Sequence, residues 1–158
     1  MEQIQEQQVI DLQIAPTKKR KIRINGDQTR ILELDLSDMG IVGRLKTAYK
    51  DLQALSKKVA ALGDDLDKET TEETLEVMDS KLKALDAEMR QKIDYLFNSN
   101  VSEVCLPDGT MYDPWEGEFM YEHIIESLAK LYENNLDAEF EKIKKRVDKH
   151  TRKYTAGR

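Results

Sequence analysis

The chain has little of what disulfide-bonded and membrane-spanning proteins are built from. Cys105 is the only cysteine among 158 residues, which excludes an intramolecular disulfide. No stretch approaches the roughly 18 consecutive apolar residues that a membrane-spanning helix needs. The first residues also lack the basic and then apolar layout of a secretion signal. We therefore expect a protein of the cytoplasm that has no membrane association.

Catalytic motifs are missing as well. His123 and His150 have no cysteine or histidine nearby at the spacing of metal ligands. Cys105 has no adjacent base or second cysteine, and we expect it to pack as a small buried hydrophobic residue. There is no glycine-rich phosphate loop and no serine in a nucleophile motif. The sequence therefore predicts no metal, no cofactor and no enzymatic activity.

Charge is abundant and mostly negative. Charged residues make up 35% of the chain and hydrophobic residues 39%, which suits a small core covered by charged helix faces. The net charge of −6 disfavours nucleic acid as the main partner, because duplex binding depends on neutralising phosphates. The length is typical of one domain.

Helical periodicity dominates the middle of the chain, from residue 38 to residue 98. Apolar residues recur there at spacings of three and four, which places them on one face of a helix. The first series is Ile41, Leu45, Ala48, Leu52, Leu55, Val59 and Leu62, and the second is Leu75, Met78, Leu82, Leu85, Met89, Ile93 and Leu96. Gly63 followed by two aspartates predicts the end of the first helix. We expect two long amphipathic helices folded against each other.

The first 37 residues have a different pattern, an alternation of apolar and polar residues that is typical of strands. Three candidate strands cover residues 9–15, 21–24 and 30–36, and Asn25-Gly26 between the last two is a strong tight-turn signal. We therefore expect a small antiparallel sheet or hairpin in this region.

The C-terminal third predicts two further helices, at about residues 118–133 and 136–153. A short apolar piece at 101–106 and a loop at 107–117 precede them. The predicted fold class is α+β and mostly α, with an N-terminal β region at 1–37 and a helical body at 38–158. The two parts form either one compact domain or a β region packed on the body.

Aromatic residues, 6% of the chain, concentrate in one segment. Tyr112, Trp115, Phe119 and Tyr121 lie within ten positions, with Tyr132 further on. Aromatic side chains are favoured anchors of protein interfaces because they bury much area with few rotatable bonds. The cluster is therefore either a second core or a patch that binds a partner.

Two regions of opposite charge suggest self-assembly. The acidic region around the predicted helix connection includes Asp64, Asp65, Glu72 and Glu73, and the basic face of the last helix includes Lys144, Lys145 and Arg146. They complement each other, within one chain or between copies. RNA or a membrane surface is the alternative for the basic helix. The separate basic run at 18–23 is either a solvated strand edge or a phosphate-binding or transport segment.

Two segments carry a resemblance to a known family. The first is Ile24-Asn25-Gly26-Asp27 leading to Leu34-Asp35-Leu36-Ser37-Asp38-Met39, and the second is Asp94-Tyr95-Leu96-Phe97-Asn98-Ser99-Asn100-Val101-Ser102-Glu103-Val104-Cys105, followed by 119–131. Together they resemble the small tail assembly chaperones of long-tailed bacteriophages that infect Gram-positive hosts. Members of that family often carry glycine where this chain has Asn98-Ser99-Asn100.

The resemblance implies a non-enzymatic protein of the bacterial host cytoplasm that keeps the tape-measure protein soluble and recruits tail-tube subunits. Residues proposed to bind these partners are Tyr112, Trp115, Phe119, Met120, Met78 and Met89, since methionine adapts to varied apolar helices. A homo-oligomer along the tape measure fits the same role. The alternatives are a connector or baseplate component of the virion, and a small nucleic-acid-binding or host-takeover phage protein.

Overall fold

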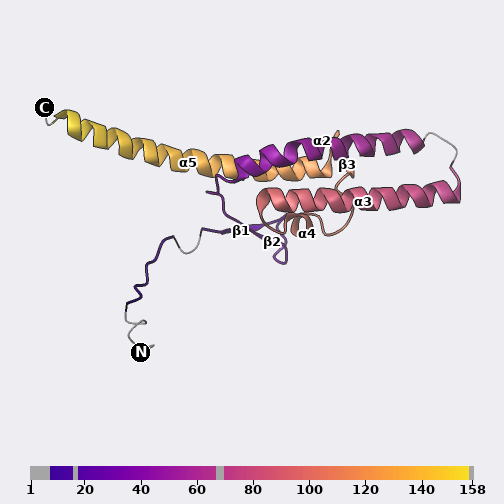
Figure 1. Cartoon of the computed structure of the whole chain (residues 1–158), viewed down its shortest axis with the longest axis horizontal. Helices are drawn as coiled ribbons and strands as arrows, with labels where there is room; N and C mark the ends of the chain where they lie inside the picture. The colour runs from indigo at the N-terminus through magenta and orange to yellow at the C-terminus, as the bar shows by residue number, and fades with distance from the viewer. Residues whose placement is uncertain (1–7, 16–17, 67–69, 157–158) are drawn as a thin grey trace.

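The computed structural model describes residues 8–15, 18–66 and 70–156. The molecule is elongated (Figure 1). A pair of antiparallel helices, α2 and α3, extends to one end of it, and the long C-terminal helix α5 projects from the other. A small β hairpin and the short helix α4 lie beside the pair, near the middle of the molecule.

The predicted N-terminal hairpin is present. Strands β1 (Arg20–Arg23) and β2 (Ile31–Leu34) pair antiparallel, with Ile22 opposite Leu32. Asn25 and Gly26 both have positive φ, 52° and 71°, as the Asn-Gly turn requires. Leu32 and Leu34 point into the core at 0% and 1% exposure, and the hairpin thereby contributes to the same core as the helices.

Of the three predicted strands, the one at residues 9–15 is wrong. Residues 8–15 form neither helix nor strand, and Val9, Ile10, Leu12 and Ile14 are between 73% and 88% exposed. An alternation of apolar and polar residues forms a buried strand face only when a neighbouring strand and a core are available to cover that face. The nearest candidate neighbour, β1, is a strand of exposed Arg and Lys side chains, a composition that resists edge pairing.

The helical hairpin is confirmed, as α2 (Ile41–Leu66) and α3 (Glu72–Phe97). Helix α2 continues through Gly63, which sequence analysis took for its end. Thr71 caps the start of α3, accepting a hydrogen bond from the Thr74 amide at 3.2 Å. At the other end Asn98 takes the left-handed conformation, φ 50° and ψ 46°, and fills the position that glycine usually takes.

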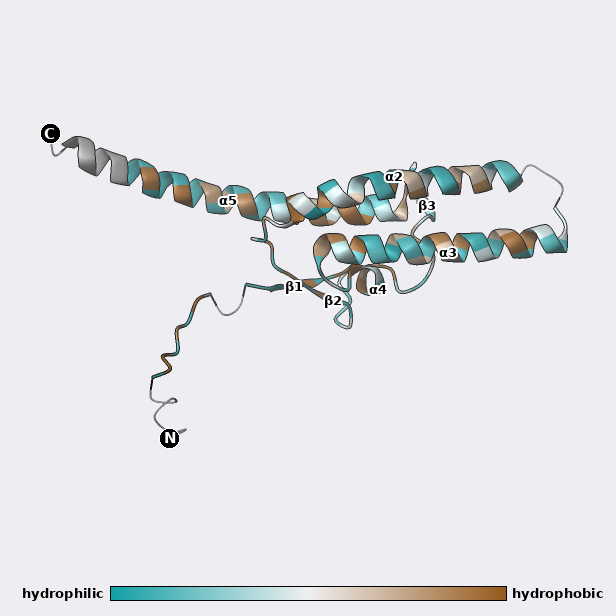
Figure 2. Ribbon diagram, in the orientation of Figure 1, coloured by the Kyte–Doolittle hydropathy of each residue, from teal (hydrophilic) through white to brown (hydrophobic). Residues whose placement is uncertain are grey.

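The predicted apolar stripes meet between these helices, and their burial is greatest toward the hairpin's base. Ala48, Leu52 and Leu55 of α2 are buried, as are Leu85, Met89, Ile93 and Leu96 of α3. Leu75, near the free end, is 49% exposed. In Figure 2 brown and teal residues alternate along both helices, as expected for helices with one buried face.

Three arginines fasten the surrounding chain to the ends of the helices. Arg90 donates to the carbonyls of Ser102, Leu106 and Gly109 at 2.9–3.2 Å, and Arg30 to those of Val104 and Cys105 at 2.9 and 2.6 Å. Arg44 donates to the Leu96 carbonyl at 2.8 Å. A guanidinium group is suited to this, because its fixed fork of donors can satisfy several carbonyls together.

The short apolar piece predicted at 101–106 is helix α4 (Val101–Cys105). A second small hairpin, which sequence analysis described only as loop, follows as β3 (Pro114–Trp115) and β4 (Glu118–Phe119). Its two-residue turn has positive φ at Glu116 and Gly117.

The last element is one helix, α5 (Met120–Ala156), and the break expected between residues 133 and 136 is absent. Asparagine in a helix interior costs only about 0.7 kcal/mol relative to alanine, too little to end a long helix. The side-chain amide of Asn135 instead donates to the Leu36 carbonyl at 3.1 Å and holds α5 against the chain that follows β2.

The fold class is therefore as predicted: a small antiparallel hairpin, a long helical hairpin, and two further helices, α4 and α5. No helix among the described residues combines the length and the apolar character needed to cross a membrane.

Candidate functional site

The aromatic segment divides between the core and the surface. Tyr112 and Tyr121 are buried, at 4% and 7% exposure, and their rings meet edge to face at 5.8 Å. Phe119 is half-buried and packs on both. Burial raises the pKa of Tyr112. The assignment of Tyr112 to partner binding is therefore corrected. A buried ring that supports the α3–α5 contact cannot also contact another chain.

Trp115 is the aromatic residue of this segment that faces outward, with 54% of its surface exposed. It lies on β3, and the His123 ring of α5 packs edge to face against it at 4.8 Å. His123 Nε2 also lies 2.8 Å from the Trp115 carbonyl oxygen. His123 thus packs against one side of the Trp115 indole, and the rest of the indole is exposed to solvent.

An apolar groove runs beside Trp115, between β1 and the first turns of α5. It encloses about 570 Å³. Its apolar lining is contributed by both elements and by the end of α4: Ile22, Ile24, Cys105, Trp115, Met120, Ile124, Leu128 and Leu131. Of the residues predicted to bind a partner, the structure therefore brings Trp115 and Met120 together here.

A second groove of about 510 Å³ separates α2 from α5. Leu45, Tyr49 and Ile125 line it, together with the hydrogen-bonded pair of Ser56 Oγ and the Tyr121 hydroxyl. Leu45 and Tyr49 are 44% and 57% exposed, although Leu45 belongs to the predicted buried stripe of α2.

The two methionines of the helical seam have different positions. Met89 is fully buried, at 0% exposure, in the core between α3 and its neighbours. It is corrected from a partner-binding residue to a core residue, since its contacts are already made within the chain. Met78 is half-buried on α3, nearer the free end of the hairpin.

The predicted charge patches lie at opposite ends of the molecule (Figure 1). Asp64 and Asp65 end α2, and Glu72 and Glu73 begin α3. The basic residues Lys144, Lys145 and Arg146 are exposed on the far part of α5. Complementarity of the two patches within one chain is therefore excluded by distance, and only contacts between copies remain.

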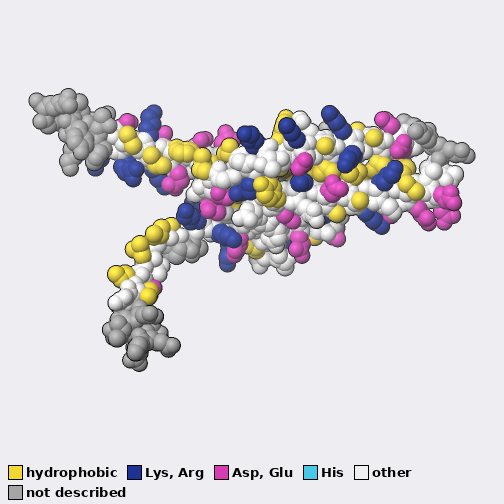
Figure 3. Space-filling model, viewed as in Figure 1, with side chains coloured by type: hydrophobic (Ala, Val, Ile, Leu, Met, Phe, Trp, Pro, Cys, Tyr) yellow, Lys and Arg dark blue, Asp and Glu magenta, His cyan; other side chains and the backbone are white. Residues whose placement is uncertain are grey.

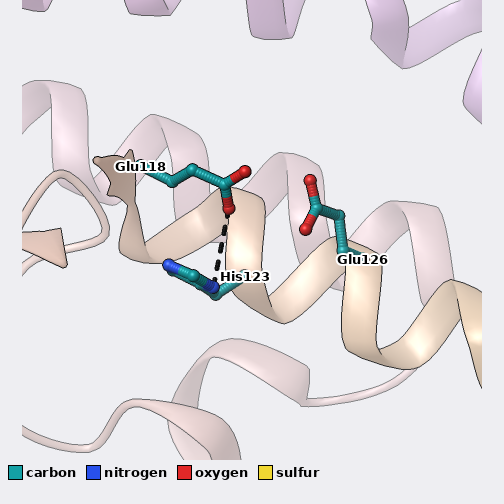
Figure 4. A group of neighbouring side chains, drawn as sticks. All are labelled: Glu118, His123 and Glu126. Atoms are coloured by element: carbon teal, nitrogen blue, oxygen red, sulfur yellow. Dashed lines mark ion pairs between the residues drawn. The ribbon is translucent and has the colours of Figure 1, made fainter. Parts of the chain in front are cut away.

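Glu118, His123 and Glu126 form a cluster that sequence analysis missed (Figure 4). One potential ligand atom of each lies within 4.8 Å of the others. His123 Nδ1 is 3.5 Å from Glu118 Oε2, an ion pair when the imidazole is protonated. The sequence signal is a carboxylate five residues before His123 and another three after it, whereas the expectation of no metal site rested on missing cysteine and histidine partners.

The cluster resembles a metal site in its residue types but not in its enclosure. Structural zinc sites use four protein ligands, and the described residues supply three here, of which Glu126 is exposed. What the arrangement does in this structure is orient the His123 ring against Trp115. The side chain of His150 lies outside the described residues.

Cys105 behaves as expected from the sequence. It is half-buried at the end of α4, and burial raises the pKa of its thiol to about 11. The thiolate, the nucleophilic form, is therefore scarce at neutral pH.

Comparison of this chain with models of protein families, with curated proteins and with solved structures gives no significant match.

Proposed function

We propose that the chain is a non-enzymatic tail assembly chaperone of a long-tailed phage, which binds and solubilises the tape-measure protein and recruits tail-tube subunits in the host cytoplasm. The resemblance of residues 24–39 and 94–105 to that family motivates the proposal. The observation that carries it is the open apolar groove between β1 and α5, edged by Trp115 and Met120.

The groove has the features that a helix-binding site needs. Ile22, Ile24 and Leu131 belong to its apolar lining, and the exposed indole of Trp115 also lines it. An amphipathic helix laid in such a groove buries side chains at three- and four-residue spacing. A tape-measure protein offers many helical segments of this kind, and the methionine in the lining adapts to differences between them.

The groove is tested by binding of purified tape-measure fragments to the full chain, measured by calorimetry. Trp115→Ala should weaken binding by about tenfold or more, as expected when an aromatic anchor is removed from an interface. Tyr95→Ala is the matched control, because Tyr95 is an exposed aromatic residue on α3 that does not line the groove. Equal affinity of the Trp115→Ala variant and the wild type would remove the groove from the account.

A further inference from the structure

The far part of α5 carries an apolar stripe on a helix that has left the body of the protein. The Asn135 side-chain amide donates to the Leu36 carbonyl and to the Ser37 hydroxyl, in the segment that follows β2. Beyond Asn135, Phe140, Ile143 and Val147 are 50%, 44% and 50% exposed. Figure 3 shows a row of yellow side chains along this arm. A helix that keeps a stripe of this kind in water has its natural partner in another helix.

The charges along the arm are arranged in two blocks. From residue 133 to 141 every charged side chain is acidic, namely Glu133, Asp137, Glu139 and Glu141. From 142 to 149 five of the six are basic, namely Lys142, Lys144, Lys145, Arg146 and Lys149, with Asp148 the exception. A helix built in this way is complementary to a reversed copy of itself.

The apolar stripe has the same symmetry. Its members Leu136, Phe140, Ile143 and Val147 are spaced four, three and four, which reads identically from either end. In an antiparallel pair centred between Phe140 and Ile143, each Phe140 faces Ile143 of the second copy, and each Leu136 faces Val147. These layers are those of a short antiparallel coiled coil, about 17 Å long.

The residues that flank the stripe complete the match. On one side lie Asp137 and Lys144, and on the other Glu139 and Arg146, as their positions on the helical wheel require. Antiparallel pairing brings Asp137 next to Lys144 of the second copy, and Glu139 next to Arg146, each twice by symmetry. In a parallel pair, the acidic block of one arm would lie beside the acidic block of the other. The two protein bodies would also meet at the same end of the pair.

We propose that the α5 arm is a self-association site, which pairs antiparallel with the arm of a second copy through Phe140 and Ile143 and through these flanking charges. The interface is isologous, since the same patch serves on both chains. It replaces the acidic hairpin tip as the counterpart of Lys144 and Arg146, while Lys145 lies on the outer face of the arm. The inference does not depend on the proposed function.

The test is a pair of charge reversals, Glu139→Arg and Arg146→Glu, studied by sedimentation over a concentration series. The wild-type chain should dimerise. Each variant alone places like charges at both Glu139–Arg146 contacts and should raise the dimer dissociation constant by about tenfold. An equimolar mixture of the two variants restores opposite charges at both contacts, and it should form a heterodimer with wild-type affinity.

Matched controls are Glu141→Arg and Lys145→Glu, which make the same changes of charge on the outer face of the arm and should leave dimerisation unchanged. Circular dichroism of all variants verifies that the helix persists. If the wild type remains monomeric at every concentration, the inference is overturned. If Arg146→Glu weakens association while the mixture gives no rescue, the basic block binds an acidic site other than the reversed arm, and the inference is equally overturned.

Discussion

At the scale of single residues, half-buried arginines hold neighbouring segments together. Arg90 Nε pairs with Asp86 at 2.9 Å, and the rest of its guanidinium donates to three backbone carbonyls. Asp86 in turn accepts a hydrogen bond from the Met111 amide at 2.7 Å. One side chain thus ties α3 to α4 and to the loop that follows it, which is the segment leading to Trp115.

We expect Arg90→Met to lower the free energy of unfolding by about 3 kcal/mol, because it leaves several carbonyls and the Asp86 carboxylate without their donor. Urea denaturation measures this loss. Lys83→Met is the control, since the Lys83–Asp79 pair is largely exposed, at 75% and 59%, and water screens such a pair so that its loss should leave stability nearly unchanged. Similar losses in both variants would contradict the role given to Arg90.

Buried groups that resist ionisation make stability depend on alkaline pH. Burial raises the pKa of Cys105 from 9.0 to about 11 and that of Tyr132 to about 12, and it also raises the pKa of Tyr121. In this range the unfolded chain loses its protons first, and rising pH therefore favours unfolding. The stabilisation that these protonated groups contribute is fully present below pH 9, and it is lost as the pH rises through their raised pKa values.

The free energy of unfolding should accordingly fall steadily from pH 9 upward, as measured by urea titrations at a series of pH values. Cys105→Ala should flatten the part of this fall between pH 9.0 and about 11. A profile that stays level over that interval in the wild type would show that the thiol is not buried as described.

At the scale of elements, the end of α3 depends on one residue in the left-handed conformation. The Asn98 amide donates back to the carbonyls of Asp94 and Tyr95 and closes the helix. Asn98→Gly should change stability by less than about 0.5 kcal/mol, because glycine has no Cβ to disfavour φ of 50°. Asn98→Ala should cost about 1 kcal/mol, because alanine keeps the Cβ but lacks the short polar side chain with which asparagine tolerates this conformation. Thermal melts of the two variants measure the difference.

Asn134→Ala serves as the comparison for Asn98, since residue 134 lies inside α5. Alanine there should raise stability slightly by its higher helix propensity. If both alanine variants moved stability in the same direction, backbone conformation at Asn98 would not be the cause.

The elements differ in how well the sequence predicts them. The helices of the hairpin follow from a periodicity sustained from Ile41 to Leu62 and from Leu75 to Leu96, and the β1–β2 turn follows from Asn25-Gly26. Residues 9–15 carry a similar alternation but acquire no partner strand, and pairing is a property of the whole fold. Gly63 and Asn134-Asn135 are weak helix breakers, and tertiary contacts such as Asn135 to Leu36 outweigh them.

The candidate site was only partly predictable for a related reason. Aromatic clustering drew attention to the segment at 112–121, but it could not separate Tyr112, which is buried, from Trp115, which is exposed. That separation depends on the two-residue turn at Glu116-Gly117, which sets Trp115 and Phe119 in their positions on the paired strands. The groove between β1 and α5 joins residues about 100 positions apart, beyond the reach of any local pattern.

At the scale of the whole molecule, the two ends are built differently. One end is a two-helix arm tipped with carboxylates, and the other is the single helix α5 with its divided charge. Between them lie the core and the groove beside Trp115. This layout leaves the groove and the self-association arm on separate parts of the chain, and a copy could therefore pair with its neighbour while holding a helix.

A chaperone and a virion component of the same shape differ in whether they remain in the finished phage particle. The chaperone role predicts that the chain is missing from purified phage particles, while tape-measure and tail-tube proteins are present, as mass spectrometry of the particles would establish. Its recovery at a fixed copy number per particle would instead support a connector or baseplate component.

The most direct test of the central claim is co-expression of the chain with the tape-measure protein of the same phage, followed by affinity capture and mass measurement of the soluble complex. If the chain is such a chaperone, the captured material is a soluble complex with many copies of this chain on each tape-measure molecule. A tape measure that stays insoluble while this chain elutes alone would contradict the chaperone role.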